Sequence, residues 1–498
     1  MRSMSVPVLF LSAVLVHGQA NAADITAKGA KDLKQQLLSA LPDGMVKDAS
    51  AMTVRARNSA YEVRVNTIAL FGLEAIKFTK AVGISPVVSL IRPLDGGLWQ
   101  IDQAGGIDVK GQTKEKGPKS NFLFSVDSYS MTGIYDPTIT YLQSGTYKAE
   151  DMRLRLQTGD SSTDIRLDAV NSTVQGTKDG DNTITIASTG SYTNLVEAIK
   201  GPKADPVGVR VGSGESSGKI EGLAYGPLQK MIPILVRSWN KPPMDEADKN
   251  LLIQLFRSNF PLFKTMSQTV VYRDIQVETP QGPFTAKRFG IETMIDGISN
   301  GARFGFGLDL VEPQMVAGLV PAAYVPLIPQ TSKIKVIVPT VNAADGINYL
   351  MDNVDYDPAQ PLTPPQKSEI SRRFFPEGIA TIAYDGTRLT SSLYDVTITG
   401  KTTFALTGND KPLVDVTVTA RDFDKTIAYL QTNAKQTPEL GQTAFFLLMA
   451  KGFAQTQDDG QLLWHVETDR TGQIKVNGNA FSIPGTAPDP APGTPPAP

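Results

Sequence analysis

The chain of 498 residues contains no cysteine and only two histidines, His17 and His465. The absence of cysteine excludes disulfides, zinc ribbons, iron–sulfur clusters and thiol catalysis. An excess of positive charge is also missing, because 48 Lys and Arg residues are matched by 50 Asp and Glu residues. We therefore expect no general attraction to nucleic acid. No stretch beyond the N-terminus has the roughly 20 apolar residues of a membrane-spanning helix.

Residues 1–22 have the pattern of a secretory signal peptide. Arg2 supplies the positive start, Val6–Val16 form a short apolar run, and Ala20–Ala22 form a small-residue cleavage site. The apolar run is much shorter than the roughly 20 residues of a membrane anchor. We expect export to the periplasm or outside the cell, with no transmembrane segment after the signal is removed.

The exported chain would then retain a single imidazole, that of His465. It lies in Leu462–Glu467, which alternates like a strand, so a cross-strand or edge histidine is expected rather than a catalytic base. The acidic clusters Asp179–Asn182 and Asp458–Gly460 are typical of turns and do not have EF-hand spacing. We expect no enzyme, no cofactor and no metal site. A hydrolase that uses carboxylates alone is the alternative from another class.

Alternation of apolar and polar residues with a period of two is the most frequent pattern, and it predicts antiparallel strands with one buried face. The clearest examples are Phe122–Val126, Met152–Leu156, Phe304–Leu310 and Val414–Val418. Turn-forming residues occur between such runs: Asp179-Gly180, Pro280–Gly282, Asp385-Gly386 and Gly408-Asn409.

Helical patterns are fewer. They are found at Leu33–Leu41, at Asp245–Phe260, from Thr363-Pro364 onward and at Leu440–Leu448. The sequence therefore predicts an α+β fold dominated by antiparallel β-sheet, built as elongated β-rich repeat modules with short packed helices.

The predicted modules come from a weak internal repeat. Thr183–Lys200, Lys335–Asn353 and Val414–Asn433 each have the pattern of a strand, a short turn and a helix. The stretch Gly212–Gly218 is glycine-rich and fits either a linker or a hairpin loop. The predicted organisation is a signal peptide at 1–22, an N-terminal β-rich region at 23–215, a middle helix and hairpin region at 216–330, a C-terminal β-rich repeat region at 331–483 and a disordered Pro-rich tail at 484–498.

Two strongly apolar segments contain prolines, Leu223–Trp239 and Met315–Pro329. The prolines are expected to prevent a regular helix and to exclude a central strand. The segments fit either core connections or flexible apolar lips that adapt to a lipid chain. In the second interpretation, the candidate ligand-binding residues are Ile232, Ile234, Leu235, Val320, Tyr324, Val325 and Leu327.

The strand pair around a Pro-Gly hairpin, Ile275–Ala286, and the stretch Leu462–Ala480 give the chain a likeness to known proteins. The pattern resembles exported β-rich proteins of the Gram-negative envelope, in the broad style of the AsmA-like group. It differs from that group in its cleavable signal and its lack of a membrane anchor. The resemblance implies a non-enzymatic envelope protein that binds lipid or a protein partner along a curved sheet. A scaffold without a ligand is the alternative.

Overall fold

A computed structural model describes most of the chain between residues 25 and 481. It leaves out the short stretches 40, 42–45, 67–68, 71–77, 84–85, 114–119, 140, 181, 203–204, 241–243, 317, 354–361, 407–410 and 470. The predicted signal peptide, the Pro-rich tail and the predicted turn at Gly408-Asn409 lie outside the described residues.

The predicted α+β class with mostly antiparallel sheet is confirmed. The chain divides into two compact units. Unit 1 comprises Met1–Val320 and Ala343–Tyr356, and unit 2 comprises Pro321–Asn342 and Asp357–Pro498. The predicted boundary at residue 215 falls inside a strand of unit 1.

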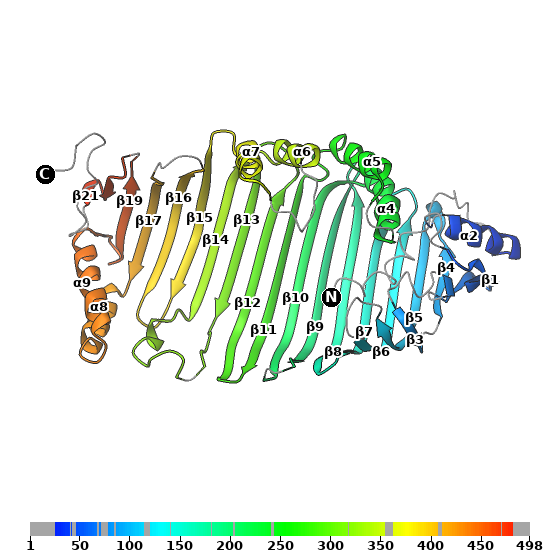
Figure 1. Ribbon diagram of the computed structural model, residues 1–498, viewed down its shortest axis with the longest axis horizontal. Helices are drawn as coiled ribbons and strands as arrows, with labels where there is room; N and C mark the ends of the chain where they lie inside the picture. Colours follow the sequence, from blue (N-terminus) through cyan, green and yellow to red (C-terminus); the bar gives the residue numbers. More distant parts are fainter. Residues whose placement is uncertain are drawn as a thin grey trace. The chain divides into compact units, whose positions relative to one another are not determined.

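Unit 1 contains an antiparallel sheet in which most strands pair with their neighbours in sequence (Figure 1). Its strands are β1 (Met52–Arg57), β2 (Ala60–Val65), β3 (Phe78–Val82), β4 (Val87–Pro93), β5 (Trp99–Thr113), β6 (Ser120–Asp136), β7 (Tyr141–Thr158), β8 (Ser161–Lys178), β9 (Thr183–Lys200), β10 (Val207–Ala224), β11 (Thr265–Thr279), β12 (Gly282–Asp296) and β13 (Ala302–Val311). The lateral order is β1, β2, β4 and then β5 to β13, with β3 beside the far end of β5.

The central strands are unusually long. Strands β7, β8, β9 and β10 have 18 residues each. At about 3.3 Å per residue, each spans roughly 60 Å. That is about twice the 30 Å thickness of a bilayer's hydrocarbon core.

The helices of unit 1 are α2 (Ala27–Ser39), α4 (Tyr225–Asn240), α5 (Glu246–Arg257) and α6 (Ala343–Asn353). Helix α2 packs Leu33 and Leu37 against Tyr61, Val63 and Ile91 of β2 and β4, which closes a buried core at this end of the sheet. Helices α4, α5 and α6 follow one another along one end of the long strands (Figure 1).

Unit 2 contains a second antiparallel arrangement of strands. These are β14 (Thr331–Val341), β15 (Ile379–Thr390), β16 (Asp395–Ala405), β17 (Leu413–Arg421), β18 (Gln455–Thr456), β19 (Leu462–Thr468), β20 (Ile474–Val476) and β21 (Asn479–Phe481). Their order is β14, β15, β16, β17, β19, β20 and β21, and β18 also pairs with β19.

Three α-helices belong to unit 2: α7 (Pro364–Phe374), α8 (Phe423–Asn433) and α9 (Pro438–Gly452). Trp464 of β19 packs with Ala420 and Phe423, and its indole Nε1 donates to the Ala450 carbonyl at 2.7 Å. This contact ties α9 to the sheet.

The four predicted helices are confirmed, and two of them begin at capping residues. Asp245 caps α5 by accepting from the Asp248 backbone N–H at 2.8 Å. Thr363 and Gln366 form a capping box at the start of α7. The second and third predicted repeat copies do run from a strand into a helix, as β14 to α6 and β17 to α8.

Three local predictions are wrong. The first repeat copy, Thr183–Lys200, is the continuous strand β9 and contains no helix. Gly212–Gly218 is neither a linker nor a loop but the middle of β10. Asp385-Gly386 does not end a strand, because it forms a register shift inside β15 with Gly386 at φ 72°. In each case, pairing to both neighbouring strands overrides the local preference for a turn or helix.

Helix α4 contradicts the expectation that proline prevents a regular helix in Leu223–Trp239. Pro227 lies in the first turn, where backbone N–H groups have no helical partner to lose. Pro233 removes one hydrogen bond from the interior. The burial of Met231 and Ile234, which are 1% and 2% exposed, stabilises the helix despite that loss.

Candidate binding site

The long sheet of unit 1 has one apolar face because the side-chain alternation of its strands shifts by one residue near mid-strand. The pairing of β5 with β6 gives the evidence. Residues Gly105 and Ile107 are two apart on β5, so their side-chain directions point to the same face. Gly105 is opposite Tyr129 of β6, whereas Ile107 is opposite Val126. Residues directly opposite in an antiparallel pair share a face. Tyr129 and Val126 therefore lie on one face although they are three residues apart, which makes this a β-bulge in β6.

The same change of phase continues across the neighbouring strands. The register pairs Val126 with Met152 and Tyr129 with Ala149, so these two residues of β7 also share a face. A row of mostly polar residues marks the change on successive strands; we call it the kink row. It consists of Asp127, Asp151, Asp168, Asn194, Gly212, Asp274 and Lys287.

Backbone conformation supports this assignment. Asp151, Asn194 and Asp274 have φ values of 50°, 52° and 53°, in the left-handed region. These residues fall on β7, β9 and β11, which are alternate strands. Asp and Asn tolerate this conformation better than other residues with side chains. In addition, Asn194 donates from Nδ2 to Asp168 Oδ2 at 2.7 Å, which links two members of the row.

We define the apolar face as the residues that the register places on this side of β5 to β13. On the side of the kink row that contains Ser120 of β6 and Lys200 of β9, the face consists of Phe122, Leu156, Thr163, Ile199, Val207, Val109, Phe124, Leu154, Ile165, Glu197, Val209, Val277, Phe284, Ile107, Val126, Met152, Leu167, Leu195, Val211, Ile275 and Ala286. Beyond the kink row are Tyr129, Ala149, Val170, Tyr192, Tyr272, Phe289, Leu310, Met131, Tyr147, Val270, Ile291, Leu308, Val174, Phe306, Tyr135, Ile186, Ile220, Met266, Ile295 and Phe304, with Gly, Ser, Thr and Gln between them and Lys178 at the end of β8.

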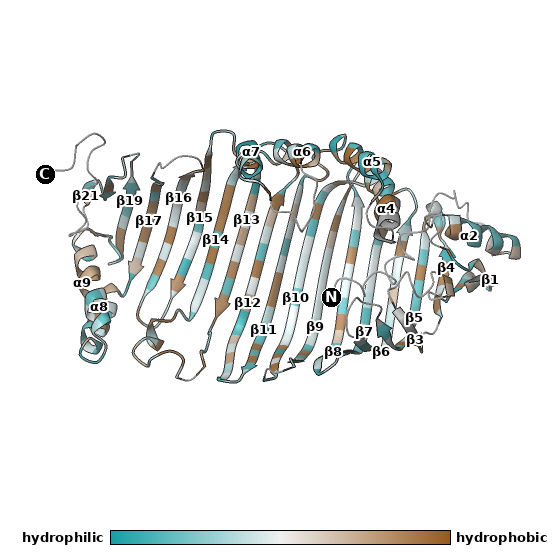
Figure 2. Cartoon of the chain, viewed as in Figure 1, coloured by the Kyte–Doolittle hydropathy of each residue, from teal (hydrophilic) through white to brown (hydrophobic). Residues whose placement is uncertain are grey.

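Many of these side chains are only half-buried, and Ile199 and Phe306 are 42% and 44% exposed. Figure 2 shows apolar and polar positions alternating along the long strands. Large exposed apolar patches are uncommon on monomeric proteins and usually mark a binding surface.

The opposite face is polar. On it, Thr173 and Thr189 face each other with hydroxyl oxygens 2.7 Å apart. Arg155 donates to Asp164 at 2.6 Å, and Arg273 pairs with Glu215 at 2.9 Å. The two faces therefore differ sharply in chemistry, although they belong to the same strands.

An aromatic strip crosses the apolar face just beyond the kink row. The ring centroids of Tyr192 and Tyr272 are 6.3 Å apart, and Tyr272 stacks on Phe289 at 6.3 Å with an interplanar angle of 8°. Gly214 lies between the two tyrosines on β10, and a Cβ there would come within 2.2 Å of the Tyr192 ring. Glycine at 214 thus lets the Tyr192 ring lie flat on the sheet.

The hydroxyl of Tyr192 is buried and has no hydrogen-bond partner among the described residues. Burial, with a smaller contribution from Tyr272, raises the pKa of Tyr192 to about 12. The phenol is therefore neutral under physiological conditions and presents an unused donor on the apolar face.

Within the described strands β5 to β13, the register places two charged residues on the apolar face. Lys178, the exposed last residue of β8, lies opposite Ile184 beyond the kink row, and Glu197 lies on the other side of that row. Glu197 lies directly opposite Ile165 of β8 and Val209 of β10. The side chain is partly exposed and has no hydrogen-bond or ion-pair partner in the described part of the chain.

The candidate residues from the sequence do not lie on this face. In unit 1, Ile234 of α4 is buried and Leu235 is 47% exposed, while the side chain of Ile232 is outside the described part. Val320, at the end of unit 1, is half-buried.

The other three candidates belong to unit 2. Tyr324 and Leu327 pack against Leu430, Leu440 and Ala444 of α8 and α9, whereas Val325 is 51% exposed. The Tyr429 and Tyr394 hydroxyls donate to the Ala323 and Leu327 carbonyls at 3.0 and 2.8 Å. This segment has the contacts of a core connection.

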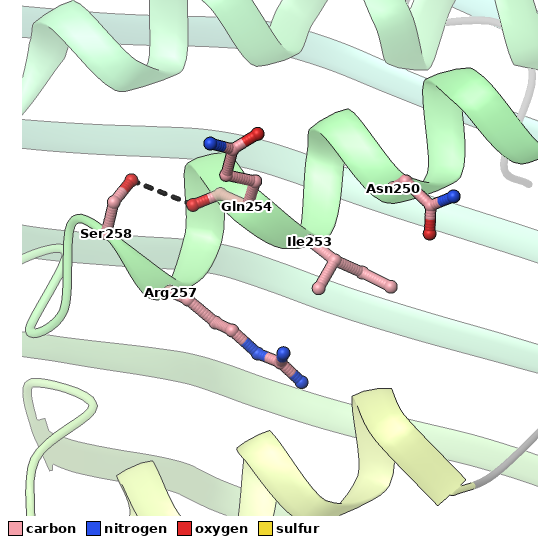
Figure 3. A pocket seen from close by; sticks show the side chains of 5 residues that line it. All are labelled: Asn250, Ile253, Gln254, Arg257 and Ser258. Carbon is pink, nitrogen blue, oxygen red and sulfur yellow. Dashed lines mark hydrogen bonds between the residues drawn. The ribbon is translucent and has the colours of Figure 1, made fainter.

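A smaller hollow of about 480 Å³ lies beside α5 and is lined by Asn250, Ile253, Gln254, Arg257 and Ser258 (Figure 3). Arg257 donates to the Asn348 carbonyl of α6 at 3.2 Å and pairs with Asp352. Its Nε and the Asn348 Oδ1 are buried without partners among the described residues.

A second apolar surface, in unit 2, is formed by one side of α9. Phe445, Phe446 and Leu448 are 59%, 56% and 45% exposed, and the two phenyl rings meet edge to face with centroids 6.0 Å apart. The other side of the helix contributes Leu440 and Ala444 to the core.

His465 lies in β19, as the alternation predicted. Its Nε2 is 3.0 Å from Asp415 Oδ1 of the neighbouring strand β17.

Hydrogen bonds from Arg372 and Arg373 lower the pKa of Glu369 to about 2, and Arg388 holds the pKa of Asp395 below its usual value. These carboxylates are ionised partners of arginines.

Two kinds of feature are absent from the described residues. No group of three or more acidic, histidine or cysteine side chains is arranged to hold a metal ion. Among the helices in the described ranges, none combines the length and hydrophobicity needed to cross a bilayer.

Comparison with known proteins gives no relative for this chain: no family model, no curated protein sequence and no solved structure matches it.

Proposed function

We propose that this is a non-enzymatic exported protein of the cell envelope that binds the apolar part of a lipid on the apolar face of unit 1. The observation that carries the proposal is the change of phase at the kink row. Because of it, the apolar side chains of the 18-residue strands lie on one face on both sides of the kink row, with Gly and Ser between them on β8, β9 and β10. A sheet without that change would divide its apolar residues between two faces.

The physical basis is burial of hydrocarbon against the aliphatic and aromatic side chains. Each buried methylene contributes about 0.8 kcal/mol. An acyl chain of about 14 methylenes would gain roughly 11 kcal/mol before the costs of association are subtracted. A strand about 60 Å long is several times the roughly 15 Å depth of one bilayer leaflet's hydrocarbon, so whole acyl chains fit along it.

Location supports the same proposal. A signal peptide at residues 1–22 would deliver the protein to the periplasm, where membrane lipids are at hand. A protein partner is the second candidate, and the exposed Phe445 and Phe446 of α9 favour it.

The test is the lipid content of the full-length protein purified from the cell envelope. We expect native mass spectrometry to show a bound amphiphile that organic extraction releases, and the extracted protein to bind a phospholipid that carries a fluorescent acyl chain. A protein that carries no lipid and binds no phospholipid would show that the apolar face serves another partner.

A further inference from the structure

Glu197 is unusual because no described residue around it provides a counter-charge or a hydrogen bond. Ile165 and Val209 lie directly opposite on the two flanking strands, and Leu195 and Ile199 are its same-face neighbours on β9. The nearest members of the kink row, Asp168 and Asn194, bond to each other. The cationic residue that the register places on the apolar face of the described strands β5 to β13 is Lys178, and it is too far away to pair with Glu197. Its partner Ile184 is 13 residues from Glu197 along β9, which is roughly 43 Å.

A ligand that covers this face removes water from the Glu197 carboxylate. An ionised carboxylate buried without a partner costs several kcal/mol, which would cancel much of the gain from the acyl chain. That cost disappears if the ligand brings a positive group to the same place. The isolated carboxylate therefore constrains the headgroup of the ligand.

We propose that Glu197 binds the primary ammonium group of an amphiphile whose acyl chains lie on the apolar face. The inference rests on the proposed function of that face. Glu197 is three residues from Lys200, the last residue of β9, so it lies about 10 Å from the end of the strand. A headgroup at Glu197 can thus reach water at the sheet edge while its chains run toward Tyr192.

The surroundings favour a primary ammonium group over a quaternary one. A primary ammonium carries three N–H donors, and hydrogen bonds between charged partners are the strong ones. Quaternary ammonium groups are held mainly by aromatic rings. The residues around Glu197 are aliphatic, and the aromatic strip at Tyr192 is five residues away along β9.

The experiment compares three phospholipids with identical acyl chains and different headgroups: ethanolamine, choline and glycerol. Binding to the delipidated full-length protein is measured for the wild type, Glu197→Gln and Glu197→Leu. The control is Glu150→Gln, which changes an exposed carboxylate outside the apolar face that accepts from Ser128 at 3.1 Å.

We expect the wild type and Glu150→Gln to prefer phosphatidylethanolamine by about tenfold. Both Glu197 variants should still bind lipid, with less than about a twofold difference between headgroups. Circular dichroism confirms that each variant is folded.

Equal binding of all three lipids by the wild type would overturn the inference, as would a preference that persists in Glu197→Leu. If the wild type shows no headgroup selectivity and Glu197→Leu associates with itself, the role of the Glu197 charge is instead to prevent two sheets from pairing. If no variant binds any of the three lipids, the proposed function itself fails, which is a different result.

Discussion

Val170→Lys is expected to weaken lipid binding by at least about tenfold, because a charged group would lie beneath the acyl chain on the apolar face. Val170 of β8 is half-buried and sits in the same lateral row as Tyr192. Lysine can partly escape by directing its ammonium group toward water, so the effect is smaller than full burial of a charge would give. The measurement is titration of the delipidated protein with phosphatidylethanolamine that carries a fluorescent acyl chain.

The next residue supplies the matched control. Asn171 is exposed and points to the polar face, opposite Lys148 on β7. Asn171→Lys introduces the same side chain one residue away on the same strand, and we expect unchanged binding. Equal losses in both variants would mean that the effect comes from charge or folding and not from the apolar face.

Gly400→Ala is expected to destabilise unit 2 by at least about 3 kcal/mol. Gly400 lies in the middle of β16 with φ 118°, and a Cβ there would be 2.2 Å from the Asp415 carbonyl oxygen and 2.8 Å from the Val416 Cα. Both atoms belong to the backbone of β17, so the strand pair itself must move apart.

A second glycine of unit 2 separates the cost of backbone strain from the cost of a steric clash. Gly460 has φ 79°, and its added Cβ would meet nothing within 4 Å. Gly460→Ala should therefore cost only about 1 kcal/mol, from the left-handed conformation alone. Urea unfolding with unchanged m-values measures both. Similar losses for the two variants would show that the β16–β17 contact tolerates a methyl group.

Much of the fold could be predicted from local patterns. Phe122–Val126 and Met152–Leu156 alternate over five residues, and this is enough to place strands with one apolar face. The helix of Thr363-Pro364 was predictable because the capping residues act within one turn of the chain. Such signals depend on neighbours in sequence, which a single sequence contains.

The candidate site depended on neighbours across strands, which the sequence does not display. Gly214 looks like part of a linker until Tyr192 and Tyr272 are known to flank it on β9 and β11. The phase change at Asp151 and Asn194 hides the alternation of β7 and β9, because the apolar positions shift by one residue in mid-strand. A search for alternation that allows one shift at an Asp or Asn would have found the long strands.

Glu197 shows the same limit at a single residue. The stretch Thr183–Lys200 was predicted to end in a helix, on which Glu197 would have been an ordinary exposed acid. In the strand it lies between Ile165 and Val209, and only that placement shows that its charge lies among apolar residues. Glu197 is a candidate ligand-binding residue because of its position in the strand register, and its residue type alone would not have indicated it.

The most direct test of the central claim is to map where a bound lipid touches the protein. Phosphatidylethanolamine with a photoreactive group in its acyl chain would be crosslinked to the full-length protein, and the modified residues identified by mass spectrometry. We predict modification of apolar-face residues on β8, β9 and β11, such as Val170, Leu195 and Val270. Crosslinks confined to the polar face, at Asn171, Val196 or Val271, or to α9 alone, would contradict the account.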